Sequence, residues 1–181
     1  MSDDVLSVHS LVEAYCYLMA TPCPACGKGP LCGASPKPLD TAGGRRTVAI
    51  EATCPTCEAV RRLCFGIPAD APTSDSDEFG VVNPTTEPSR ILDVAQWIML
   101  HEICAESARK EKTPAQTRRL NLKAARCLEE ALKFYDEVGN DLPPSEGFFQ
   151  EATRRRFRQN PERFSRRRLL NLRAGLPKPL P

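Results

Sequence analysis

The sequence predicts an α+β protein in which a small cysteine-rich β module precedes a bundle of helices. Two observations support this fold class. Two Cys-Pro-x-Cys motifs, at residues 23–26 and 54–57, lie beside alternating apolar residues that are typical of strands. From residue 89 onward, apolar residues recur every three or four positions, which is typical of amphipathic helices. Aromatic residues make up only 6% of the 181 residues, so the core is expected to be aliphatic and mostly helical.

The first half of the chain predicts a short helix, then strands, then a linker. Residues 5–19 carry apolar side chains at helical spacing, so an N-terminal helix is expected within residues 1–20. In the module at residues 21–66, alternation at residues 48–52 predicts a strand leading into Cys54, and residues 60–65 predict a second strand. Residues 36–44 have the composition of a loop, and the proline-rich and acidic residues 67–88 that of a linker.

Two long helices are predicted next. Ser89 is expected to cap the first helix, which should reach about residue 111. Thr113 is expected to cap the second, with Pro114 in its first turn and Gly139 as its stop. The short turn between them predicts an antiparallel hairpin.

Two further helices complete the predicted bundle at residues 89–175. Ser145 is expected to cap a third helix that carries Phe148, Phe149 and Phe157. Asn160 is expected to open a fourth helix that Gly175 closes, and residues 176–181 form a tail.

The cysteines point to a metal site. The chain has nine cysteines, an odd number, and its acidic N-terminus is unlike a secretory signal. Close CxxC spacing then favours metal ligation over a disulfide framework. Two such pairs supply four thiolates that can converge on one tetrahedral site, which predicts Cys23, Cys26, Cys54 and Cys57 as ligands.

Residues 21–66 resemble a zinc ribbon, a module in which two CxxC knuckles sit on turns and are joined by a β-hairpin. The resemblance implies one structural Zn²⁺ on those four cysteines. The chain departs from the common pattern in two ways: 27 residues separate Cys26 from Cys54, where about 15–20 are usual, and Glu58 stands where glycine is usual. Cys32 and Cys64 follow the two motifs and are expected to be packing residues, with a six-sulfur cluster or a redox switch as the alternative.

The metal and the remaining thiols leave alternatives open. Iron in a rubredoxin-like site would use the same four ligands, and zinc is favoured because few aromatic residues flank the motifs. Cys104 and Cys127 lie on the two long helices and are expected to be core residues, with a redox contact as the alternative. His101 and Trp97 are expected to pack in the first long helix rather than to act as a base or a partner anchor.

The C-terminal region is strongly basic. Net charge is +2 for the whole chain, yet residues 146–181 contain ten basic and three acidic residues. Guanidinium groups suit phosphates and carboxylates, so these arginines predict a surface for nucleic acid or an acidic partner, with a solvated helix face as the plain alternative. The predicted residues are Arg154, Arg155, Arg156, Arg158, Arg163, Arg166, Arg167 and Arg168.

These features predict a non-catalytic zinc-binding adaptor with a protein partner, because no phosphate loop, nucleophile elbow or paired-carboxylate motif is present. A nucleic-acid-binding protein and a redox-responsive or electron-transfer protein are the alternatives. No apolar run is long enough for a membrane span, and a cytoplasmic location is expected. The sequence leaves the oligomeric state open.

Overall fold

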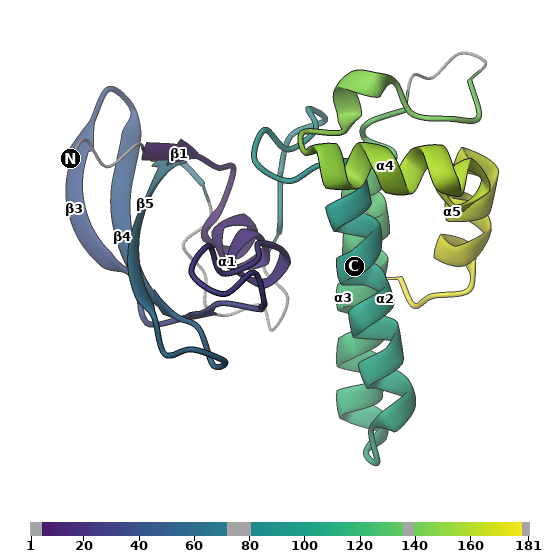
Figure 1. Cartoon of the computed structure of the whole chain (residues 1–181), viewed down its shortest axis with the longest axis horizontal. Coiled ribbons are helices and arrows are strands. Elements are labelled where there is room, and N and C mark those ends of the chain that lie inside the picture. Colours follow the sequence, from purple (N-terminus) through teal and green to yellow (C-terminus); the bar gives the residue numbers. More distant parts are fainter. Residues whose placement is uncertain (1–4, 72–80, 136–139, 179–181) are drawn as a thin grey trace. The chain divides into compact units, whose positions relative to one another are not determined.

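The structure, a computed structural model, describes residues 5–71, 81–135 and 140–178. It combines α-helices with a mixed β-sheet, which confirms the predicted α+β class (Figure 1). The chain forms two compact units. Unit 1 comprises Met1–Thr85 with Ser89–Ile91, and unit 2 comprises Thr86–Pro88 with Leu92–Pro181.

Unit 1 is a five-stranded sheet with one helix against it. The strands are paired in the order β1-β5-β4-β2, and β3 also pairs with β4. β1 runs parallel to β5, and the other pairs are antiparallel. The strands are β1 (Val5–Ser7), β2 (Cys32–Gly33), β3 (Lys37–Ala42), β4 (Arg45–Thr53) and β5 (Val60–Pro68).

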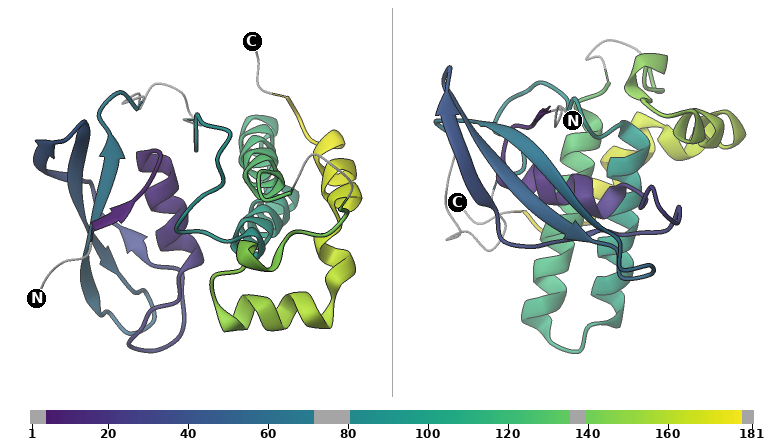
Figure 2. Two further views of the ribbon diagram at one scale, coloured as in Figure 1. Left: turned by 90° about the horizontal axis from the view of Figure 1, so that it is seen from above. Right: turned by 60° about the vertical axis from the view of Figure 1, so that its left-hand side comes forward.

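Helix α1 (Leu11–Ala20) covers one face of this sheet, as Figure 2 also shows. Ala14 and Leu18 of α1 pack with residues such as Ile50 of β4 and Phe65 of β5, all fully or almost fully buried. Gly33 allows the close approach of β2 to the helix, because a Cβ there would lie 2.6 Å from Cδ1 of Leu18. Val48, Ile50 and Ala52 of β4 lie in this core, as the alternation at residues 48–52 predicts. In β5 the consecutive residues 64–67 are all buried.

Two predictions for unit 1 are wrong. Residues 5–7 form a strand rather than the start of the helix, because their backbone pairs with Cys64–Gly66 and Ser10 caps α1 only afterwards. Residues 37–42 form β3 rather than a loop. All six side chains of β3 are exposed, so no apolar alternation marks the strand, and it forms on the free edge of β4.

Unit 2 is built on an antiparallel hairpin of α2 (Val94–Lys110) and α3 (Pro114–Leu132). Helix α4 (Glu151–Gln159) crosses the end of the hairpin at which α2 begins, and α5 (Arg166–Ala174) follows it (Figure 1). Two 3₁₀ turns, η1 (Ser145–Gly147) and η2 (Pro161–Phe164), connect these helices. No helix in the described ranges is long and apolar enough to cross a membrane.

The hairpin begins later than predicted. Asp93, not Ser89, caps α2, because Asp93 and Gln96 form a reciprocal capping box. The predicted start of α3 is confirmed: the Oγ of Thr113 accepts from the N–H of Gln116, and Pro114 occupies the first turn. The predicted stop at Gly139 lies outside the described residues.

The C-terminal helices are shorter than predicted. Ser145 opens only a 3₁₀ turn, and α4 starts at Glu151 because the N–H of Phe149 is donated to Asp93 instead of to a helical carbonyl. Asn160 likewise precedes a 3₁₀ turn, and Ser165 caps α5. Gly175 ends α5 as predicted.

Candidate metal centre

The two CPxC motifs occupy two turns of unit 1. The first, residues 23–26, lies in the loop between α1 and β2. The second, residues 54–57, is part of the turn that joins β4 to β5. β2 pairs with the end of β4, through Cys32 and Thr53, and this pairing brings the two turns together although 27 residues separate them in the chain.

The backbone follows the same path through both turns. The carbonyl of Cys23 accepts from the N–H of Gly27, and the carbonyl of Cys54 accepts from the N–H of Glu58, at 2.7 and 2.9 Å. Gly27 and Glu58 both adopt a positive φ, 68° and 58°. Glu58 therefore takes the left-handed conformation that suits glycine, in spite of its side chain.

The four sulfur atoms converge at these turns and are the only group of three or more potential ligands found among the described residues. All lie within 4.8 Å of one another, and the Sγ atoms of Cys23 and Cys57, and of Cys26 and Cys54, are 3.7 Å apart. Cys23 and Cys54 are fully buried, whereas Cys57 is exposed. The four predicted ligands are thus close enough to hold one metal ion.

The four sulfurs and the backbone around them shift the pKa values of Cys54 and Cys57 in opposite directions. The backbone N–H of Thr56, which points at the sulfur, lowers the pKa of Cys54 to about 6, against the opposing effect of burial. The backbone N–H of Ala59 pulls the pKa of Cys57 down, but the sulfurs of Cys26, Cys54 and Cys23, together with burial, raise it to about 12. Four thiolates this close repel one another electrostatically, and a bound metal cation would offset that repulsion.

Cys32 and Cys64 do not join the metal group. Cys32 pairs with Thr53, and Cys64 pairs with Ala49, whereas the side chains on the helix side of β4 include Ile50. Both cysteines therefore project from the opposite face of the sheet. Cys64 is buried, as expected for a packing residue, but Cys32 is exposed, so the packing role predicted for Cys32 is wrong.

The other residues singled out in the sequence lie in the core of unit 2. Trp97 is completely buried. His101 is buried and lies 3.1 Å from the carbonyl of Ala124 through its Nδ1, and burial lowers its pKa. The thiols of Cys104 and Cys127 hydrogen bond between α2 and α3, which lowers the pKa of Cys104. The predicted packing of all four residues is confirmed.

The predicted arginines divide by what their side chains contact. Arg158 pairs with Glu151, and Nη2 of Arg163 lies 2.5 Å from Oε1 of Glu102. Arg154 and Arg168 donate to backbone carbonyls of residues 148 and 163. No side-chain hydrogen bond or ion pair to another described residue is present for Arg155, Arg156, Arg166 and Arg167.

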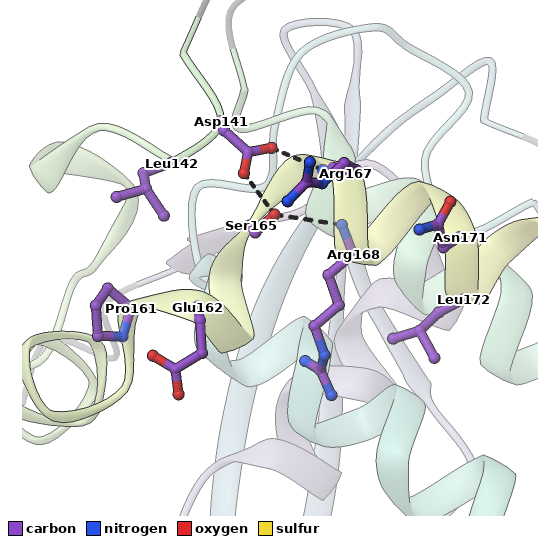
Figure 3. Close-up of a pocket in the computed structure, with 9 residues that line it drawn as sticks. All are labelled: Asp141, Leu142, Pro161, Glu162, Ser165, Arg167, Arg168, Asn171 and Leu172. Atoms are coloured by element: carbon purple, nitrogen blue, oxygen red, sulfur yellow. Dashed lines mark hydrogen bonds between the residues drawn. The ribbon is translucent and has the colours of Figure 1, made fainter.

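An open groove of about 760 Å³ lies beside α5 (Figure 3). Its polar lining includes Asp141, whose carboxylate accepts from the Oγ of Ser165 and the N–H of Arg167, at 2.6 and 2.8 Å. These bonds lower the pKa of Asp141, with the Ser165 hydroxyl as the largest cause. Asp141 therefore already neutralises the positive end of α5. The sequence did not reveal this contact, because 24 residues separate Asp141 from Ser165.

Comparisons of the chain with protein-family models, with curated proteins and with solved structures found no match. The geometry of the cysteine cluster and the chemistry of the surfaces are therefore the guides to function.

Proposed function

We propose that this chain is a non-catalytic zinc-binding adaptor, in which one structural Zn²⁺ is held by Cys23, Cys26, Cys54 and Cys57. The observation that supports the metal is the spacing of the sulfurs. Zn–S bonds of about 2.3 Å in a tetrahedron place neighbouring sulfurs about 3.8 Å apart. Two of the sulfur pairs lie at 3.7 Å.

The proposed zinc would fasten a small sheet into a ribbon-like module. It would tie the loop before β2 to the turn between β4 and β5, in the manner of two facing zinc knuckles. The matching hydrogen bonds and positive φ values of the two turns support this assignment. A module with a core this small gains much of its stability from such a metal.

The proposed absence of catalysis follows from the ligand count. Four cysteine thiolates fill a tetrahedral zinc ion and leave no position for water or substrate. The metal would then hold a surface in shape for a protein partner. Because ribbon-like modules occur in proteins of unrelated function, the adaptor role rests on this closed site alone.

Metal analysis of the purified full-length chain tests the assignment. We expect one zinc per chain, and a cobalt-substituted protein with the absorption of tetrahedral Co²⁺ bound to thiolates. A stoichiometric iron content with visible absorption would instead assign the site to electron transfer. Proximity labelling in cells then tests the adaptor role. Proteins labelled by the wild-type chain should no longer be labelled by the Cys54→Ser variant. The same set of labelled proteins for both chains would contradict the adaptor role.

A further inference from the structure

We propose that the solvent side of α4 binds the phosphates of a single-stranded nucleic acid, with Phe149 stacking on a base. This surface, the α4 arginine face, consists of the exposed Arg154, Arg155 and Arg156 of α4 together with Phe149, which precedes the helix. It is narrower than the run of arginines in the sequence, and it is separate from the cysteine cluster, which lies in unit 1.

The helix presents its arginines away from the core. Thr153 is buried and Phe157 is half-buried, and these two residues, four apart, mark the inner side of α4. Successive residues are turned by about 100° around the helix. Arg155 therefore lies opposite the inner side, and Arg154 and Arg156 lie on either side of Arg155. All three arginines are exposed.

Internal pairing leaves this face positively charged. Glu151 is the only acidic residue of α4, and it pairs with Arg158. Arg155 and Arg156 contact no acidic side chain among the described residues, and Arg154 uses its Nε to donate to the carbonyl of Phe148 at 3.1 Å. Guanidinium groups with unused donors suit phosphate oxygens, which they can bind through two hydrogen bonds.

Phe149 supplies the feature that favours a single strand over a duplex. Its ring is 40% exposed although it packs against Phe134, with ring centroids 6.2 Å apart. Its backbone N–H is donated to the buried carboxylate of Asp93 at 3.1 Å, so the residue is anchored. Arg154 donates to the carbonyl of Phe148, so this arginine lies next to the start of Phe149. An anchored, exposed ring next to an arginine is the arrangement on which unpaired bases stack. An acidic peptide would use the charges but not the ring.

Fluorescence anisotropy with a labelled 20-nucleotide oligouridine tests the proposal on the full-length chain. We expect Arg155→Ala/Arg156→Ala to weaken binding about tenfold or more at about 50 mM salt. The slope of log K against log salt should become less steep by about 1.4, since each lost phosphate contact on a single strand accounts for about 0.7. Phe149→Ala should weaken binding about fivefold or more and leave the slope unchanged, because stacking releases no counterions.

A matched control separates this surface from general attraction to a basic protein. Arg61 and Arg62 are also adjacent, exposed arginines, but they lie on β5 of unit 1. Arg61→Ala/Arg62→Ala removes the same charge and should leave the affinity and slope unchanged. Circular dichroism of each variant should match the wild type.

Four results would overturn the proposal. They are no binding at about 50 mM salt, equal losses in the two double variants, tighter binding to a 20-base-pair duplex, and competition by oligoglutamate as effective as that by oligouridine. The last result would assign the face to an acidic protein. Zinc analysis of Arg155→Ala/Arg156→Ala should give the wild-type content, so failure of this proposal is distinguishable from failure of the metal assignment.

Discussion

Glu58 holds a backbone conformation that normally belongs to glycine. Its φ is 58°, and its counterpart in the first cysteine turn, Gly27, has a φ of 68°. No atom lies within 4 Å of a Cβ built on Gly27, so the conformation alone disfavours a side chain there. The two turns thus have the same geometry but different residues at the same point.

Substitutions at these two positions should have opposite effects. Glu58→Gly should stabilise unit 1 by roughly 0.5–1 kcal/mol by removing the left-handed strain, and Gly27→Ala should destabilise it by roughly 1 kcal/mol. Urea unfolding at a fixed concentration of free zinc, followed by circular dichroism, measures both changes. A loss of stability in Glu58→Gly would show that its side chain matters more than its backbone.

His101 makes the stability of unit 2 depend on pH. Burial lowers its folded pKa below the ordinary value of 6.5, and the unfolded chain keeps the ordinary value. The unfolded state therefore binds more protons in the window between the lowered pKa and 6.5. Stability should be full above pH 6.5 and fall as the pH falls through this window.

His101→Gln should remove this part of the pH dependence. Glutamine is uncharged and can still donate to the carbonyl of Ala124. The measurement is urea unfolding between about pH 5 and 7.5, followed by the fluorescence of Trp97, the only tryptophan. An unaltered slope in His101→Gln would assign the pH dependence to other groups.

At the scale of elements, one carboxylate joins two helices. Asp93 is completely buried, and its Oδ1 accepts from the N–H of Gln96 at the start of α2. Its Oδ2 accepts from the N–H of Phe149 and, at 2.6 Å, from the Oγ of Thr153 on α4. Asp93 therefore fixes where α2 begins and how α4 lies across the hairpin.

Asp93→Asn should lower the free energy of unfolding by roughly 2–3 kcal/mol, because its amide replaces one acceptor with a donor that faces another donor in either orientation. Thr113→Ala is the matched control. Thr113 is an exposed cap whose side chain accepts one hydrogen bond, from the N–H of Gln116 at 3.4 Å. Its loss should lower the free energy of unfolding by at most about 1 kcal/mol. Urea unfolding followed by Trp97 fluorescence compares the two, and equal costs would contradict the joining role of Asp93.

The same contact shows why the sequence predicts some elements and misses others. The start of α3 is local, since Thr113, Pro114 and Gln116 lie within four residues, and it is predicted correctly. The start of α4 depends on Asp93, 56 residues from Phe149, and β3 depends on the free edge of β4. Periodicity and capping rules describe neighbours in the chain and cannot represent such partners.

At the scale of the whole molecule, the four clustered cysteines were predictable and their setting was not. The four cysteines stand out because CxxC pairs have a fixed spacing. Pairing between distant residues determines the rest. It lets β2 bring the two turns together, and it places β1 and α1 in the same unit as the cysteines. The two cysteine pairs are encoded locally, whereas the unit that brings them together is encoded by its core.

The division into two units predicts a selective loss of structure. Cys54→Ser removes a buried thiol of the cysteine cluster, so the proposed metal should leave and residues 21–66 should unfold. The helices of unit 2 should stay largely formed, because their core and caps lie within that unit. We expect loss of zinc and of strand signal in circular dichroism, with helical signal and Trp97 fluorescence retained.

Cys32→Ser is the matched control and should keep its zinc, since Cys32 lies on the other face of the sheet. Retained stoichiometric zinc in Cys54→Ser would contradict the four-cysteine site, and collapse of the helical signal would contradict the independence of the units.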